Sequence, residues 1–279
     1  MKIAVTGGSG RVGKAVSAMA LAEGHSVVSI DRVAPGSVVE RTNITYIQAD
    51  ITDYAALENA FRGCDALVHQ AAIPSPGHFP DYIVHNNNVI GSYNAMRAAV
   101  EVGIQKICQA SSVNATGLAY SRWPHFDYFP LDEKHPTYSE DPYSLSKWIC
   151  EEQASSLARR YEKTLTISSL RYHWVTPERP GLAQIAGFKN PDSLTKNLWA
   201  YTLLSAAAKA CLLALTADFK GHEVFYIAAP ETVIADTPSL ELAQKHFPGV
   251  PVRGDLSGHK SFFNSSKAER LLGWKHDFE

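Results

Sequence analysis

The sequence predicts an α/β protein in which a doubly wound parallel sheet is covered by helices on both faces. Short apolar runs typical of buried strands alternate with segments of helical periodicity from residue 3 to residue 170. Gly24, Gly63 and Gly103 each end a helical segment. Residues 176–279 show a looser pattern, so we expect a smaller second part there.

The first strand and helix are predicted at residues 3–5 and 11–23. Gly7, Gly10 and Gly13 lie where the strand must turn into the helix. The phosphates of a dinucleotide can reach the N–H groups of a helix N-terminus only where side chains are absent. Glycine is also common in turns that bind nothing, so the spacing alone leaves both interpretations open.

The second strand, residues 26–30, ends at Asp31. An acid about 20 residues past such glycines accepts the ribose hydroxyls of NAD and repels the 2′-phosphate of NADP. Arg32 could pair with that phosphate, so NAD is favoured and NADP stays open. Asp50 ends the next strand, residues 44–49, on the same edge of the sheet, where it could bond the adenine amino group.

The alternation continues along the chain. We predict helices at 54–61, 81–102, 142–161 and near 196–216, and strands at 66–68, 106–110, 164–170 and near 223–228.

We assign residues 1–175 to an NAD(P)-binding domain, to which the strand near 223–228 returns, and residues 176–279 to a substrate-binding part. Residues 176–190 form a linker rich in Pro and Gly. Residues 113–140 form a long loop rich in aromatic side chains. Such loops are usually functional, although packing of the aromatics explains it equally well.

Composition excludes several classes of protein. The 26 Lys and Arg balance 28 Asp and Glu without a basic run, which argues against a nucleic-acid or membrane partner. The most apolar stretch, residues 198–217, contains Lys209, so a buried helix explains it better than a membrane span. No signal peptide is recognised, and the four cysteines lack ligand spacing. We expect a cytoplasmic protein with no metal.

Tyr143 and Lys147 lie four residues apart on the helix predicted for 142–161, so they share one face. Bringing a phenol from a pKa near 10 to about 7 requires about 4 kcal/mol. An ammonium about 4 Å away, at an effective dielectric near 20, supplies about that much. Ser112 follows the strand 106–110, at the edge where such sheets bind ligands. Tyr143 is therefore a candidate general base, with Ser112 holding the substrate oxygen.

Several ordered motifs together carry a family resemblance. They are TGGSGRVG (residues 6–13), Asp31, Asp50, HQAA (69–72), NVIGSYN (88–94), ASSVNATG (110–117), DPYSLSK (141–147), LRYHW (170–174) and LLGW (271–274). In this combination the chain resembles the extended short-chain dehydrogenases/reductases, the NAD-dependent epimerase/dehydratase family. The resemblance implies a Rossmann-type fold, and in size the chain is similar to the family's uronate dehydrogenases.

The resemblance also implies which residues form the catalytic, cofactor-binding and substrate-binding sites. Ser112, Tyr143 and Lys147 would be catalytic, with Ser112 preferred to Ser111, and Asn88 would lie in the helix behind the site. The predicted cofactor contacts are Gly7, Gly10, Arg11, Val12, Gly13, Asp31, Arg32, Asp50, Ile51, Ala71, Ala72, Tyr143, Lys147 and Tyr172. The predicted substrate contacts are Ser75, Ser111, Asn114 and Trp174.

Departures from the family patterns narrow the reaction. Dehydratases have an acidic pair after the catalytic hydroxyl, where this chain has Val113 and Asn114, so dehydration is not expected. Nucleotide-sugar epimerases have LRYFN after the sixth strand, but Trp174 replaces that Asn. Uronate dehydrogenases carry Ser-Ser-Asn-His at the positions of residues 111–114. This chain has Val113 and Asn114 at the last two of these positions, which makes a uronate substrate doubtful.

We predict a reversible hydride transfer between NAD and a secondary alcohol of a small sugar or related polyol. One alternative is an NAD-dependent nucleotide-sugar epimerase, and another is a regulator that senses NAD(P) without turnover. The resemblance also implies a homodimer through the helices 81–102 and 142–161, with apolar residues such as Leu145, Trp148 and Ile149 at the contact.

Overall fold

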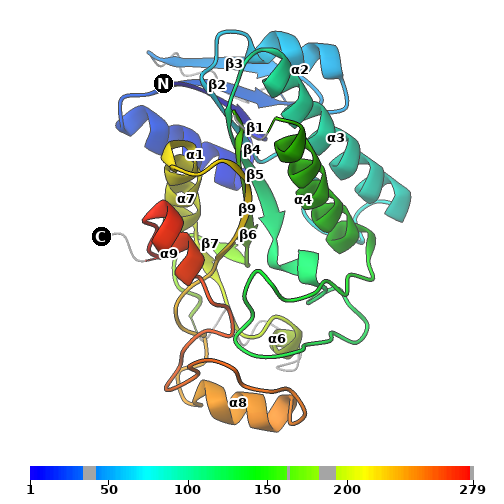
Figure 1. Ribbon diagram of the computed structural model, residues 1–279, viewed down its shortest axis with the longest axis vertical. Coiled ribbons are helices and arrows are strands. Elements are labelled where there is room, and N and C mark those ends of the chain that lie inside the picture. Colours follow the sequence, from blue (N-terminus) through cyan, green and yellow to red (C-terminus); the bar gives the residue numbers. More distant parts are fainter. Residues whose placement is uncertain (34–41, 162–163, 182–192, 277–279) are drawn as a thin grey trace.

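The computed structural model describes residues 1–33, 42–161, 164–181 and 193–276. Its main feature is a seven-stranded, all-parallel sheet in the order β3-β2-β1-β4-β5-β6-β9 (Figure 1). The strands are β1 (Lys2–Thr6), β2 (Ser26–Asp31), β3 (Ile44–Gln48), β4 (Ala66–His69), β5 (Lys106–Ser112), β6 (Thr166–Tyr172) and β9 (Gly221–Ile227). The predicted doubly wound sheet is confirmed. Strand order reverses between β1 and β4, the position where such sheets bind ligands.

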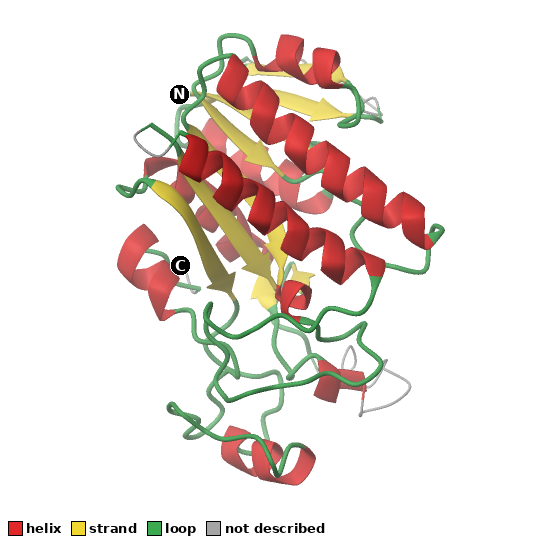
Figure 2. Ribbon diagram, turned by 45° about the vertical axis from the view of Figure 1, so that its right-hand side comes forward, coloured by secondary structure: helices red, strands yellow, loops and turns green. Residues whose placement is uncertain are grey.

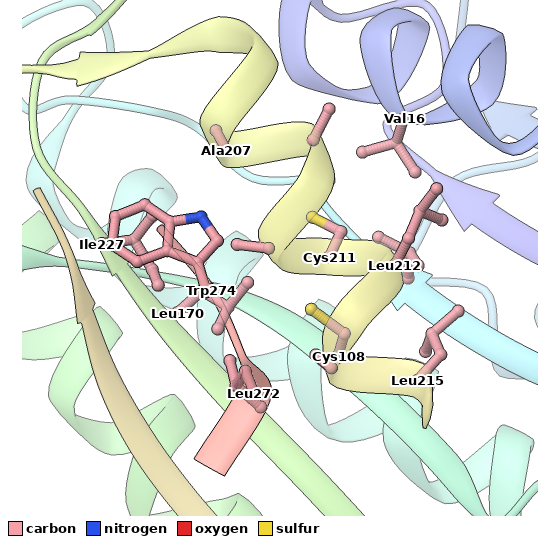
Figure 3. Packing of buried hydrophobic residues seen from close by; sticks show 14 of the residues in the cluster. Val16, Cys108, Leu170, Ala207, Cys211, Leu212, Leu215, Ile227, Leu272 and Trp274 are labelled. Carbon is pink, nitrogen blue, oxygen red and sulfur yellow. The ribbon is translucent and has the colours of Figure 1, made fainter. Parts of the chain in front are cut away.

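Helices cover both faces of this sheet (Figures 1 and 2). On one face lie α2 (Tyr54–Phe61), α3 (Asp81–Glu101) and α4 (Pro142–Arg160), and on the other lie α1 (Arg11–Ala22), α7 (Leu204–Thr216) and α9 (Ser266–Leu272). Figure 3 shows the core on the second face, where Cys211 and Leu212 of α7 pack near Val16 of α1. The Trp274 indole N–H donates to the Ala206 carbonyl at 2.9 Å, which fixes the chain after α9 against α7.

The start of α4 is fixed by its cap. The Asp141 carboxylate accepts hydrogen bonds from the backbone N–H groups of Tyr143 and Ser144, at 3.0 and 2.9 Å. Pro142 occupies the first turn, where its missing N–H and fixed φ favour a helix. These contacts hold Tyr143 at the end of α4 that lies nearest the carboxyl edge of the sheet.

The predicted helix near 196–216 is wrong in its first part. The chain instead forms α6 (Ser193–Lys196), then a turn, then β8 (Thr202–Leu203), which pairs with β7 (Val175–Thr176), and only then α7. Leu198 and Trp199 have φ values of 51° and 52°, which interrupt any helix. Both side chains are buried, so the apolar pattern reflects a buried turn rather than a continuous helix.

The remaining C-terminal residues, with α8 (Ser239–His246), extend beyond the carboxyl edge of the sheet (Figure 1). The long loop 113–140 packs here, and its Phe126 and Phe129 rings lie 5.2 and 5.4 Å from Phe247. Packing, one of the two interpretations of the aromatic loop, therefore explains the presence of these two rings. The pairing of β9 with β6 returns the chain to the main sheet. The predicted linker, residues 176–190, lies largely outside the described residues.

No helix in the described part of the chain combines the length and the apolar character needed to cross a bilayer.

Candidate active site

The turn after β1 leaves no room for side chains. Gly7 has φ +69°, and a Cβ there would strike the backbone N of Ala71, which follows β4. A Cβ on Gly13 would strike the carbonyl oxygen of Gly7. The N-terminus of α1 therefore lies directly beneath an open backbone surface, which suits the phosphates of a dinucleotide.

A pocket of about 400 Å³ extends from this turn along the ends of β2 and β3. The Asp31 carboxylate accepts from the backbone N–H groups of Ser9 and Val33, both at 3.0 Å. Hydrogen bonds from the Thr52 N–H and hydroxyl, with the nearby Arg32 charge, lower the pKa of Asp50. Each carboxylate has further lone pairs, so both can still accept from a ligand.

A second pocket, of about 750 Å³, adjoins the first and shares Gly7, Gly10, Gln70, Ala72 and Pro74 with it. The two pockets bring together all but two of the predicted residues; Ser75 and Asn88 line neither. Of the predicted residues, the first pocket is lined by Gly7, Gly10, Asp31, Arg32, Asp50, Ile51, Ala71 and Ala72. The second is lined by Gly7, Gly10, Arg11, Val12, Gly13, Ala72, Ser111, Ser112, Asn114, Tyr143, Lys147, Tyr172 and Trp174.

Ser112 and Tyr143 meet in the second pocket. Ser112 ends β5 and Tyr143 lies in the first turn of α4; both line this pocket, and the Ser112 side chain is near enough to lower the pKa of the Tyr143 phenol. The Tyr143 ring is 7% exposed and packs edge-on against Tyr120, with 5.8 Å between ring centroids. The phenol is thus held firmly, with its oxygen beside the serine.

The pKa of Tyr143 does not follow the expectation from sequence. Burial raises it well above the usual value for a phenol, and the nearby Ser112 side chain only partly opposes this. Lys147 Nζ lies 5.8 Å from the centroid of the Tyr143 ring and donates to the Ala110 carbonyl at 2.8 Å. Burial lowers the pKa of Lys147. Lys147 alone therefore does not make the phenol acidic, because the cost of burying a phenolate is the larger effect.

Asn88 lies behind the pocket, in α3, and joins three elements. Its Oδ1 accepts from the Ile73 N–H at 2.8 Å, and its Nδ2 donates to the Ile73 carbonyl and to Ser146 Oγ, both at 3.1 Å. Ser146 is on α4, one turn from Tyr143. Asn88 therefore ties the loop after β4 to the helix that carries Tyr143 and Lys147.

Sequence reasoning missed a buried ion pair beside the pocket. Arg171 of β6 donates to both carboxylate oxygens of Glu151, at 2.9 and 2.7 Å, and to the Tyr226 hydroxyl at 3.2 Å. The Ser111 hydroxyl donates to Glu151 at 2.5 Å, so it points into this network. The sequence places Glu151 four residues after Lys147 on the same helix face, but it gives no signal for the pairing with Arg171 of β6.

Three other predicted residues have partners within the chain. The Tyr172 hydroxyl lies 3.0 Å from Cys211 Sγ, and Arg11 donates to the Val175 carbonyl at 2.9 Å. The backbone N–H of Trp174 donates to His173 Nδ1 at 2.7 Å. Their predicted roles toward a ligand stay predictions.

Three histidines make the fold sensitive to acid. Burial lowers the pKa of His69 to about 3 and the pKa values of His173 and His222 to about 4. A histidine near pKa 6.5 when unfolded then binds fewer protons when folded, so stability is complete above pH 6.5 and is lost as the pH falls toward 4. We expect each residue to lower the unfolding free energy by about 1.4 kcal/mol per pH unit in this range.

Urea unfolding at a series of pH values between 7 and 5 tests this. The variant His69→Gln should show a slope shallower than that of the wild type by about 1.4 kcal/mol per pH unit, since one of the titrating histidines is gone. An unfolding free energy independent of pH in this range would contradict the assignment.

The chain is similar to several known proteins. The family model described as NAD dependent epimerase/dehydratase family matches residues 3–184. An L-arabinose 1-dehydrogenase (NAD(P)(+)) of Haloferax volcanii is 38% identical over 180 residues, covering 62% of this chain and 67% of that protein. A UDP-glucose 4-epimerase of Neisseria meningitidis serogroup C is 25% identical over 292 residues, covering 100% of this chain and 81% of that protein.

Among solved structures, the chain is similar to UDP-glucose-4-epimerase from Stenotrophomonas maltophila with bound NAD and formylated UDP-arabinopyranose. The TM-score is 0.73 at 26% identity, and the likeness covers 100% of this chain and 94% of that one. The chain therefore belongs to the NAD dependent epimerase/dehydratase family and is an enzyme of the extended short-chain dehydrogenase/reductase type.

Proposed function

We propose that the protein transfers a hydride between NAD and a secondary alcohol of a small sugar or related polyol. The observation that carries the proposal is the composition of the second pocket. Ser112, Tyr143 and Lys147 line it beside the glycine turn, and no Asp or Glu is among its described lining residues. An acid/base phenol is therefore available for an alcohol proton, while dehydration lacks a carboxylate.

The residues fit a bound dinucleotide, because the backbone at Gly7 and Gly13 is open only in the absence of a Cβ. When bound, oxidised NAD supplies a hydride acceptor and a positive charge. Tyr143 accepts the hydroxyl proton of the substrate, and Ser112 holds the same oxygen by a hydrogen bond. Lys147, anchored on the Ala110 carbonyl, adds positive charge and holds the ribose. Burial excludes water from the phenol.

Asp31 supports NAD as the cofactor, since its carboxylate lines the first pocket and would repel a 2′-phosphate. Arg32 lines the same pocket, and the Haloferax volcanii relative is named for both cofactors. NADP therefore stays a second candidate, to be separated by comparing kcat/KM with the two dinucleotides.

A small sugar is supported by Trp174, whose large side chain lines the pocket in a position where nucleotide-sugar epimerases have Asn. The 38% identity to a protein named L-arabinose 1-dehydrogenase favours the same class. Epimerisation of a nucleotide-linked sugar is the second candidate, because proteins named UDP-glucose 4-epimerase match over the whole chain.

A screen with added NAD separates the two candidates. Free aldoses, uronates, polyols and UDP-sugars are each offered, and both NADH absorbance and the configuration of the recovered sugar are measured. The proposal expects net NADH with at least one free sugar. Inversion of a UDP-sugar without net NADH would favour the epimerase.

We further propose a homodimer through α3 and α4. Tyr82, Ile90 and Tyr93 of α3 are 65%, 47% and 45% exposed and lie at helical spacing on one side of that helix. The predicted Leu145, Trp148 and Ile149 of α4 are half-buried on the protomer. A second copy would cover these apolar side chains.

Ile90→Asp is therefore expected to convert the dimer to a monomer, because an unpaired carboxylate would be buried at the contact. Sedimentation velocity measures the change. Leu240→Asp is the matched control, since Leu240 on α8 is 44% exposed but lies away from α3. A wild-type protein that sediments as a monomer, or a dimer that Ile90→Asp leaves intact, would refute this interface.

A further inference from the structure

Asn114 holds the hydroxyl of Ser112 from two directions. It follows β5 in the 3-10 turn Val113–Thr116. Ser112 Oγ accepts from the Asn114 backbone N–H at 3.1 Å and from Asn114 Nδ2 at 3.4 Å. Ser112 is 5% exposed and Asn114 is 9% exposed, so water does not compete freely for these bonds.

The orientation of the Asn114 amide is fixed by a third contact. Its Oδ1 accepts from the backbone N–H of Ala119 at 2.9 Å. A backbone N–H can only donate, so the oxygen of the amide must face Ala119 and its NH₂ group must face Ser112. The amide therefore acts as a donor toward Ser112.

A serine hydroxyl has one hydrogen and two lone pairs. The two N–H groups of Asn114 occupy both lone pairs of Ser112 Oγ, so this hydroxyl has only its hydrogen left to offer. Tyr143 lines the same pocket, and Ser112 is near enough to lower the pKa of its phenol. Any hydrogen bond that Ser112 makes into this pocket is therefore one that it donates.

We propose that Asn114 is a positioning residue that fixes Ser112 as a hydrogen-bond donor into the second pocket, toward the Tyr143 phenolate before the substrate binds and toward the substrate oxygen once it is bound. This inference rests on the proposed oxidoreductase function. A donor stabilises the phenolate that must be present before Tyr143 can accept a proton, whereas an accepting serine would hold the proton on Tyr143. Asn114 thus acts on the reaction through Ser112 rather than by touching the reacting atoms.

Other groups near Tyr143 oppose this donor. Tyr120 from the loop after the 3-10 turn, Asp141 at the N-cap of α4 and Cys150 of α4 all raise the pKa of the phenol, in addition to burial. Lys147 of α4 contributes positive charge 5.8 Å from the ring, and the same charge helps to lower the pKa of His69 of β4. Ser112 is the neighbour that lowers the pKa of Tyr143.

Two variants separate positioning of Ser112 from anchoring of the loop. Asn114→Asp keeps the side-chain shape and an acceptor for Ala119, but replaces the donor toward Ser112 with an acceptor. Ser112 would then turn its hydrogen to the new carboxylate. Asn114→Ala removes both side-chain contacts but introduces no competing acceptor, and the backbone donor remains.

If Asn114 positions Ser112, Asn114→Asp should be the more damaging change. We expect kcat to fall by about 10- to 100-fold and the pH midpoint of kcat to rise by about one unit or more. NAD affinity should not change. Asn114→Ala should shift the midpoint less. The opposite ranking, with Asn114→Asp tolerated and Asn114→Ala severely impaired, would show that Asn114 only anchors the loop and would overturn the proposal.

A double-mutant cycle tests whether the effect passes through Ser112. In a Ser112→Ala background, most of the loss caused by Asn114→Asp should disappear, because no hydroxyl remains to be reoriented. Independent, multiplying losses would contradict the proposal.

A titration without sugar keeps this test separate from the proposed function. Tyrosinate absorbance of the NAD-bound protein, with the Tyr143→Phe spectrum subtracted, reports the ionisation of Tyr143 directly. A higher midpoint in Asn114→Asp supports the positioning role even if no sugar is oxidised, in which case only the proposed function fails. An active wild-type enzyme whose Tyr143 titration is unchanged by Asn114→Asp would refute the positioning role alone.

Discussion

Tyr143→Phe is expected to lower kcat/KM for NAD-linked oxidation by about 10³- to 10⁴-fold. The substitution removes the phenolic oxygen that accepts the proton and keeps the ring, which packs with Ile73 and Val84 and edge-on against Tyr120. The fold and the cofactor pocket should therefore be preserved. Steady-state kinetics gives the loss, and calorimetric titration with NAD should give an unchanged affinity within a few-fold.

Tyr138→Phe is the control for this variant. Tyr138 lies on the same long loop as Tyr120, and its hydroxyl bonds Asp127 at 3.1 Å, outside both pockets. Loss of that phenol should leave kcat/KM nearly unchanged. If Tyr143→Phe retained wild-type activity, acid/base catalysis by this phenol would be refuted, and a different catalytic group would have to be sought.

Gly7→Ala is expected to weaken NAD binding by about 100-fold, equivalent to about 2.7 kcal/mol. The added Cβ would strike the backbone after β4 at Ala71, and φ +69° is unfavourable for alanine. The turn must then open, and the N–H groups that would face the phosphates move. Equilibrium titration of the variant with NAD and NADH measures the loss.

Gly24→Ala controls for backbone strain. Gly24 also has a left-handed φ of +79°, but nothing lies within 4 Å of a Cβ added there. We expect this variant to lose about 1 kcal/mol of stability and no NAD affinity. Equal weakening of NAD binding by the two substitutions would mean that strain, and not the shape of the turn, controls affinity.

The sheet was predictable because its signals are local. Strand and helix periods differ, and Gly24, Gly63 and Gly103 each adopt the positive φ that ends a helix. The order of the first six strands then follows from the doubly wound topology. The same reasoning gave a wrong helix at Leu198 and Trp199, since burial of a turn produces an apolar run that resembles a helix.

The candidate site was predictable in its members but less so in its electrostatics. Spacing along α4 places Tyr143 and Lys147 on one face, yet it gives no distance and no burial. The Lys147 ammonium is held by the Ala110 carbonyl, and burial raises the pKa of the phenol. The pairing of Glu151 with Arg171 joins residues from a helix and a strand, and only the tertiary fold shows it.

Isotope transfer tests the central claim most directly. The protein is incubated with NAD and an aldose that carries deuterium at the carbon to be oxidised, and the released cofactor is analysed by mass spectrometry. Net hydride transfer predicts one deuterium in free NADH and an oxidised sugar. Deuterium that stays in a recovered sugar of inverted configuration, with no free NADH, would contradict the account.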